Sequence, residues 1–80
     1  MSEQQVVPLS DVVSGARVVV VRLDGGEGFR GKVIAMGIIP GKELTVQSYS
    51  RRGPLVVQID GSRVALGREL AGRVLVRRAA

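Results

Sequence analysis

Cysteine and histidine are both absent from this chain of 80 residues. Without cysteine there is no disulfide framework, thiolate ligand or thiol nucleophile. Without histidine the chain lacks the commonest metal ligand and the commonest general base at neutral pH. The serines have no imidazole to activate them, and no pair of buried carboxylates stands out as an acid and a base. We therefore expect no enzymatic activity and no catalytic residues.

The remaining candidate metal ligands are seven carboxylates, which are scattered along the chain. Only Asp24 and Glu27 lie close together, and they more simply begin a turn and complement a helix N-terminus. Carboxylates alone favour hard ions such as Mg²⁺ or Ca²⁺ and make unselective sites for transition metals. We expect no metal site and no cofactor, and in particular no tight binding of Fe²⁺ or Zn²⁺.

Aromatic residues and long apolar runs are scarce as well. Phe29 and Tyr49 are the two aromatic residues. No apolar run approaches the ~20 residues that cross a bilayer, and the first residues lack the basic flank and apolar core of a signal peptide. These absences predict a cytoplasmic protein.

Positive charge is in excess, with 12 Lys and Arg against 7 Asp and Glu and a net charge of +5. Such an excess indicates a nucleic acid, an anionic membrane face or an acidic protein surface as partner, or serves solubility alone. Arg51 and Arg52 occupy a Gly-Pro loop beside Tyr49, and Arg77 and Arg78 lie near the C-terminus. The two pairs could form a basic rim, although each alone is also typical of a solvated loop or tail. The candidate partner contacts are Arg51, Arg52, Tyr49 and Ile38.

The composition favours a single small β domain, because valine is abundant and most of the eleven glycines, about twice the usual ~7%, fall at expected turns. We predict a frayed N-terminus over residues 1–7 and one domain over residues 8–78. The predicted fold is mainly β: a small SH3-like barrel of about five strands, with one short helix between the first and second strands and a short helical turn before the last. Asp60-Gly61 predicts a two-residue hairpin turn, because both central positions of a type I′ turn need a positive φ. Strands are expected at residues 17–23, 42–49, 55–59, 62–66 and 73–77, the helix at 27–36, the helical turn at 67–72, and a further short turn at 9–13.

The run from Met36 to Gly41 predicts a sharp junction between helix and strand. An apolar stripe at helical spacing ends at Met36, and Gly37 can then end the helix with a positive φ. Pro40 and Gly41 suit the centre of a type II turn, since proline presets its φ and glycine accepts the positive angle. We expect Met36, Gly37, Pro40 and Gly41 to be structural residues.

Four consecutive valines make the strand at residues 17–23 apolar on both faces. Both faces should then be covered, the inner one by the core and the outer one by the N-terminal turn or by another chain. The second alternative leaves a weak homodimer open.

The segment from Gly26 to Gly31 matches the pattern G-x-G-x-x-G between a strand and a helix. In a dinucleotide-binding unit this loop places a pyrophosphate at the helix N-terminus. Such a unit belongs to a doubly wound domain of several βαβ units, whereas the rest of this chain is typical of hairpins. We interpret the glycines as the entry to a short helix.

The segment from Met36 to Gly41, followed by Glu43-Leu-Thr-Val46, resembles the signature of the FeoA family of small ferrous iron transport proteins. The resemblance extends to residues 9–15, 17–26, 53–57, 64–71 and 74–76, and so covers roughly residues 8–77. It implies an SH3-like cytoplasmic protein that docks on and modulates a FeoB-type membrane transporter for ferrous iron, which carries a cytosolic G-protein domain. The chain departs from the family at Gly28 and Gly31, where better helix formers are common.

A nucleic-acid-binding SH3-like barrel of the KOW type is the alternative. The segment from Gly15 to Val33 resembles the KOW motif of ribosomal and transcription-elongation proteins. A KOW unit turns into a second strand after Gly28, whereas a FeoA-like chain forms a helix that ends at Gly37. The helical spacing of the apolar residues favours the helix, so we expect no nucleic-acid partner. A scaffold role without a transporter is a third interpretation.

Overall fold

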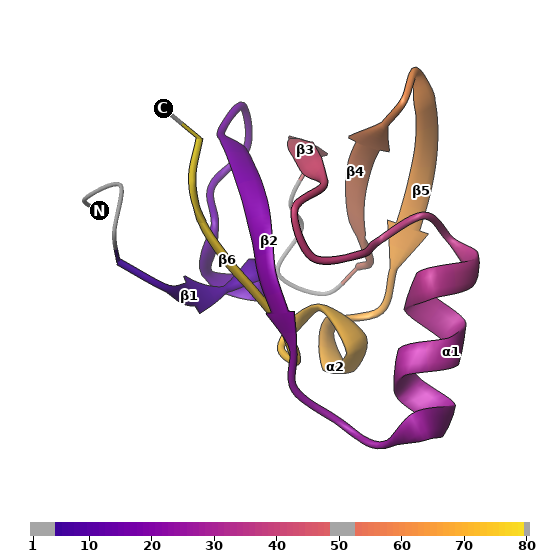
Figure 1. Ribbon diagram of the computed structural model, residues 1–80. Coiled ribbons are helices and arrows are strands. Elements are labelled where there is room, and N and C mark those ends of the chain that lie inside the picture. Colours follow the sequence, from indigo (N-terminus) through magenta and orange to yellow (C-terminus); the bar gives the residue numbers. More distant parts are fainter. Residues whose placement is uncertain (1–4, 49–52, 80) are drawn as a thin grey trace.

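The computed structural model describes residues 5–48 and 53–79. Its strands form one antiparallel sheet in the order β1-β6-β2-β3-β4-β5, with two short helices at one end (Figure 1). The strands are β1 (Val7–Pro8), β2 (Arg17–Leu23), β3 (Glu43–Ser48), β4 (Leu55–Ile59), β5 (Ser62–Leu66) and β6 (Val74–Arg78). The helices are α1 (Glu27–Ala35), α2 (Arg68–Ala71) and the 3₁₀ turn η1 (Leu9–Asp11).

The predicted mainly β, SH3-like architecture is confirmed, with two corrections. The sheet has six strands instead of about five, because Val7 and Pro8 pair with Val76 and Leu75 of β6. Val7 is therefore not frayed, and residues 1–4 of the predicted frayed segment lie outside the described residues. The sheet is also not closed into a barrel, since β1 and β5 stand at its two ends. Pro8 fits an end strand because it has no N–H to donate to a further neighbour.

The core lies inside the curved sheet and is closed by the helices. Alternate residues of β2 and β6 point into it, as the buried Val18, Val20, Val74 and Val76 show. Helix α1 contributes Phe29 and Val33, and the segment around η1 contributes Leu9 and Val12. No polar or charged side chain among the described residues is buried. The side chains of the core therefore contribute through apolar burial, at about 25 cal/mol per Å² of apolar surface removed from water.

The junction between α1 and β3 has the predicted geometry. Gly37 has a φ of +91°, its N–H donates to the Ile34 carbonyl at 2.9 Å, and the Ile38 N–H donates to the Val33 carbonyl at 2.9 Å. These two bonds define a Schellman motif, in which a left-handed residue satisfies the last carbonyls of a helix. The helix thus ends at Ala35 with Met36 as its cap, one residue earlier than expected.

The type II turn after this helix end is also confirmed. The Lys42 N–H donates to the Ile39 carbonyl at 3.0 Å, and Gly41 has a φ of +91°. The turn is tied to β2 by two further backbone bonds, from Gly41 to the Val20 carbonyl at 2.8 Å and from Val20 to the Lys42 carbonyl at 2.9 Å. The loop between α1 and β3 therefore lies directly beside the middle of β2.

The hairpin between β4 and β5 is the most regular part of the sheet. Asp60 and Gly61 have φ values of 50° and 81°, which confirms the predicted turn with two positive φ angles. The strands pair without a register shift from Ile59↔Ser62 at the turn to Leu55↔Leu66 at the far end.

Candidate docking surface

The sequence-predicted partner contacts are not brought together by the described structure. Tyr49, Arg51 and Arg52 lie outside the described residues. Ile38 was expected at a partner surface, and this expectation is wrong, because its side chain is fully buried. As the second residue after the helix cap, Ile38 turns back onto the helix and packs in the core.

The outer face of β2 is apolar and only half covered. Val19 and Val21 are half-buried, whereas Val18 and Val20 between and beside them are buried in the core. A bulge between Val20 and Arg22 lets Val21 and Arg22 both face outward. The predicted cover by the N-terminal turn is not what the structure has, because η1 packs against α2 and β6 and contributes Leu9 and Val12 to the core.

Apolar side chains continue this outer face in both directions. On one side Leu75 pairs with Arg22 and with Pro8, and both apolar residues are half-buried. On the other side the turn beside Val20 carries Ile39, which is 42% exposed, and the end of α1 carries Ile34, which is 46% exposed. We call this surface the apolar band and define it as Pro8, Val19, Val21, Ile34, Ile39 and Leu75.

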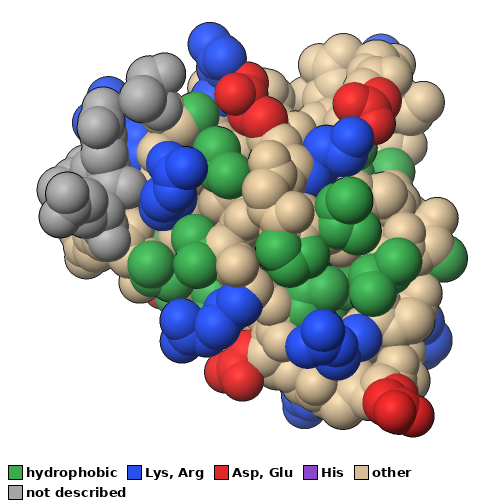
Figure 2. Space-filling model, in the orientation of Figure 1, with side chains coloured by type: hydrophobic (Ala, Val, Ile, Leu, Met, Phe, Trp, Pro, Cys, Tyr) green, Lys and Arg blue, Asp and Glu red, His purple; other side chains and the backbone are tan. Residues whose placement is uncertain are grey.

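Figure 2 shows hydrophobic side chains crossing this face of the molecule, from the end of α1 over the loop before β3 to β2 and β6. Lysine and arginine side chains lie along both margins of these hydrophobic side chains. Arg22 and Arg30 are exposed, and Arg30 also donates to the Leu23 carbonyl at 3.3 Å. Lys42 is paired with Asp60 at 2.7 Å. Contiguous exposed apolar surface with a polar margin is typical of protein–protein interaction sites.

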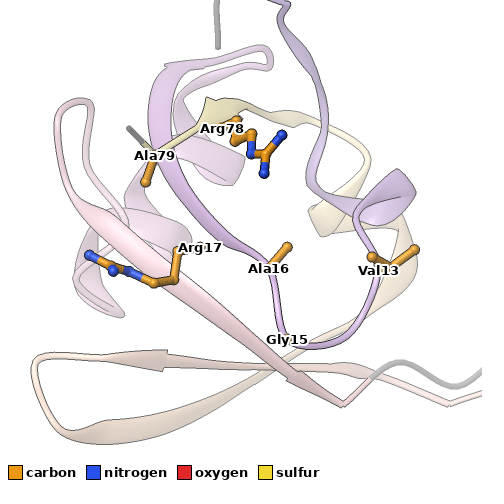
Figure 3. Close-up of a pocket in the computed structure, with 6 residues that line it drawn as sticks. All are labelled: Val13, Gly15, Ala16, Arg17, Arg78 and Ala79. Carbon is orange, nitrogen blue, oxygen red and sulfur yellow. The ribbon is translucent and has the colours of Figure 1, made fainter. Parts of the chain in front are cut away.

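A hollow of about 430 Å³ lies at the other end of β2, between the loop before it and the end of β6. Figure 3 shows the guanidinium of Arg78 over the middle of this hollow and that of Arg17 pointing away from it. Arg17 reaches Glu43 instead, at 2.6 and 3.0 Å, so its charge is already paired. Val13 on the opposite wall is 71% exposed. The described residues that line the hollow are small, apolar or cationic, so they offer apolar and cationic contacts to a bound molecule.

The described residues contain no group of three or more His, Cys, Asp or Glu side chains that could hold a metal ion. Nor does any helix in residues 5–48 and 53–79 have the length and apolar character needed to cross a membrane.

The fold also decides between the sequence motifs. Strands β2 and β3 on either side of α1 are antiparallel, so the glycine pattern from Gly26 to Gly31 is not the loop of a parallel βαβ unit. Gly26 caps the N-terminus of α1, as interpreted from the sequence. The segment after Gly28 is helical, which is the feature that separates a FeoA-like chain from a KOW unit.

Sequence reasoning missed Ile34 and Ile39 as surface residues. Ile34 could have been found, because it follows the core residue Val33 and falls off the apolar helix face. Ile39 could have been found from its place at the start of the turn. Val21 lies on the outer face by simple alternation with the buried Val18 and Val20, as a strand of four valines predicts; the bulge alters the direction of Arg22 and Leu23 instead.

Comparison with known proteins gives a consistent answer over the whole fold. A family model described as the FeoA domain matches residues 7–78. A "Putative Fe(2+) transport protein A" of Methanocaldococcus jannaschii is 35% identical over 69 residues, which cover 86% of this chain and 83% of that protein. A crystal structure of an iron uptake regulatory protein, FeoA, superposes with a TM-score of 0.90 at 40% identity, covering 94% of this chain and all of the other.

One relative is a fusion. The "Fe(2+) transport protein A/Fe(2+) transporter FeoB fusion protein" of Porphyromonas gingivalis is 36% identical over 69 residues. The match covers 85% of this chain but only 8% of that protein. This chain is therefore similar to one small part of a much longer polypeptide that also carries a transporter.

Proposed function

This chain belongs to the FeoA domain family, and from that membership we propose that it is a small cytoplasmic adaptor that regulates a FeoB-type ferrous iron transporter. It docks on the cytosolic part of the transporter, which carries a G-protein domain, and neither transports iron nor hydrolyses nucleotide itself. The observation that supports this most directly is the fused relative, in which a matching segment and a FeoB transporter share one polypeptide. Fusion keeps two partners at a high effective concentration, which is useful only when they associate.

The apolar band is the docking surface in this proposal. Ile34 and Ile39 stand nearly half exposed at one end of the band and lose that exposure when a partner covers them. Fully burying a large aliphatic side chain contributes about 1.5–3 kcal/mol, and these two side chains have a little under half of that burial left to gain, which together is a substantial share of the energy of a small interface. The cations along its margins, Arg22 and Arg30 among them, speed the encounter with an acidic partner.

Binding of purified variants to the isolated cytosolic part of the transporter tests this proposal. The double variant Ile34→Asp, Ile39→Asp should weaken binding at least about tenfold, because two charges would have to be desolvated at the interface. Val13→Asp is the matched control, since Val13 is 71% exposed and lies outside the apolar band. The proposal fails if the wild-type chain does not bind, and the choice of surface fails if both variants bind as the wild type does.

Arg51 and Arg52 remain proposed contacts with the transporter, with Tyr49 beside them in the sequence. Replacing both arginines by serine should slow association with the transporter and leave folding intact, because surface substitutions usually change stability by less than about 0.5 kcal/mol. A gel-shift assay on the same variant addresses the nucleic-acid alternative. Retardation of RNA or DNA by the wild type at physiological salt, with no binding to the transporter, would favour the alternative.

A further inference from the structure

The two end strands of the sheet are unlike each other. Strand β1 has two residues, and one of them is Pro8. Strand β5 has five residues, Ser62 to Leu66, with no proline and no register shift against β4. Proteins usually blunt an end strand by shortening it, bulging it or placing proline in it, because an open edge pairs readily with other chains. The β1 edge is blunted in this way, and the β5 edge is not.

The register of the hairpin shows which backbone groups of β5 face outward. Ile59 and Ser62 flank the two-residue turn and form the first hydrogen-bonded pair. Hydrogen-bonded pairs alternate along an antiparallel ladder, so Val64 and Leu66 also bond to β4. The N–H and C=O groups of Arg63 and Ala65 therefore point away from β4. The sheet has no strand on that side, and no backbone bond within residues 5–48 and 53–79 engages these four groups.

The side chains at this edge add a charge and a polar surface. Arg63 and Ala65 are exposed on the outer face, while Val64 packs against the core from the other face. Arg63 makes no ion pair with any residue that the structure describes, unlike Arg17, Lys42 and Arg73. It lines a shallow hollow of about 560 Å³ with the polar side chains of Thr45, Gln47 and Ser48.

We propose that β5 is a strand-addition site that takes an extended acidic segment of a protein partner as an additional antiparallel strand. The added strand exchanges backbone hydrogen bonds with Arg63 and Ala65 and places a carboxylate opposite the Arg63 guanidinium. Main-chain bonds supply affinity in this mode of recognition, and the alternate side chains supply specificity. A cross-strand pair of opposite charge is favourable, whereas like charges in that position are destabilising.

The charge of the molecule selects this occupant over a second copy of the chain. Two copies paired through β5 about Val64 would place Arg63 of each copy opposite Ala65 of the other. The two Arg63 side chains would then be diagonal neighbours on one face, about 7–8 Å apart. Each copy also carries a net charge of +5. An acidic segment can bond to the same backbone groups, and its carboxylates attract the Arg63 guanidinium where a second copy would repel it.

The residues that define this site, Arg63 and Ala65, do not belong to the apolar band, although the loop that carries Ile39 meets the β4–β5 turn through the ion pair of Lys42 with Asp60. Strand β5 stands at one end of the sheet, and β3 and β4 lie between it and β2. Strand addition at β5 therefore goes beyond the proposed docking on a transporter and can be tested without any transporter present.

The experiment uses amide hydrogen exchange and NMR titration of the full chain. The probe is a capped synthetic peptide of sequence Thr-Val-Glu-Val-Glu-Val-Thr. In the free protein the amides of Arg63 and Ala65 should exchange rapidly, while that of Val64 is protected by its bond to β4. Adding the peptide should slow exchange at Arg63 and Ala65 and shift their resonances, with little change at Val21 or Ile34.

Two control peptides and three variants separate the contribution of charge from that of backbone hydrogen bonding. A peptide with lysine in place of glutamate should bind about fivefold more weakly, and Arg63→Glu should reverse that preference. Arg22→Glu makes the same charge change on another strand and should leave the preference as it is. A peptide N-methylated at alternate positions, and the variant Ala65→Pro, each remove an edge hydrogen bond and should reduce binding to both charge types. The N–H of residue 65 is not used by β4, so Ala65→Pro should fold; if it does not, Arg63→Glu and the N-methylated peptide still decide.

Three results would overturn the proposal. The first is slow exchange at Arg63 and Ala65 in the free protein at high dilution, because the edge would then already be covered. The second is protection of these amides that appears only as protein concentration rises, because a second copy would then be the occupant. The third is equal binding of the glutamate and lysine peptides by the wild type.

Discussion

At the scale of single residues, Gly37 carries the junction between α1 and β3 through its backbone angle. A Cβ at this position would meet only the Ile59 Cγ2 atom, at 3.6 Å, which is ordinary van der Waals contact. The requirement for glycine at this position therefore comes from the φ of +91° and not from lack of space. For a residue with a Cβ, such a backbone angle costs about 1–3 kcal/mol, and the cost is highest for β-branched residues.

We predict that Gly37→Val lowers the free energy of unfolding by more than about 1 kcal/mol, measured by urea denaturation. Gly37→Asn is the matched variant, because asparagine adopts the left-handed region more readily than other residues with a side chain, and it should cost less. Equal losses for valine and asparagine would show that filling the space, and not the backbone angle, sets the cost.

At the scale of an element, α1 is weakened by the glycines at positions 28 and 31. Both positions are exposed, and a Cβ at either would meet nothing within 4 Å. Glycine inside a helix costs roughly 0.5–1 kcal/mol relative to alanine because it loses more backbone entropy on folding. Position 31 lies past the first turn of α1, where that cost applies in full.

We predict that Gly31→Ala raises the free energy of unfolding by about 0.5–1 kcal/mol and that Gly28→Ala raises it by less. Gly25→Ala provides the contrast, because its Cβ would lie 2.5 Å from the Cδ2 atom of Phe29, a core residue. That variant should destabilise the protein, as the ring must shift. Thermal melting of the three variants checks the order, and a stabilised Gly25→Ala would contradict the described packing of Phe29.

At the scale of the whole molecule, the net charge of +5 acts over distance while the apolar band acts on contact. Exposed charges are screened over ~8–10 Å near physiological ionic strength, whereas apolar burial is not weakened by salt. Salt should therefore affect how fast a partner is found more than how long it stays bound.

We predict that raising the salt concentration from about 0.05 to about 0.5 M slows association with the cytosolic part of the transporter and changes dissociation little. Arg22→Ser should flatten this salt dependence. Arg17→Ser should flatten it less, because Arg17 is already paired with Glu43 at 2.6 Å. Surface plasmon resonance gives both rate constants, and a salt effect confined to dissociation would contradict this division of roles.

Local signals in the sequence were sufficient wherever a few neighbouring residues decide the backbone. Gly37, Pro40-Gly41 and Asp60-Gly61 predicted the helix end and two turns, because each angle depends on the residue that adopts it. The bounds of β2, β4 and β5 followed from the apolar runs between these turns. The family resemblance predicted the SH3-like fold and suggested a transporter as partner. The absence of cysteine and histidine narrowed the metal sites and catalytic groups that the chain could form.

Only the tertiary structure decided which apolar residues face outward. Ile38 and Ile39 are neighbours of equal hydrophobicity, yet the first is fully buried and the second is 42% exposed. The bulge that turns Arg22 outward and Leu23 into the core, the pairing of Val7 with β6 and the open edge at β5 likewise depend on strands far apart in the chain. The hydrophobicity of a residue is a property of its own side chain, so the sequence determines it. Whether that side chain is buried depends on what packs against it, and this is decided by pairing between segments far apart in the chain.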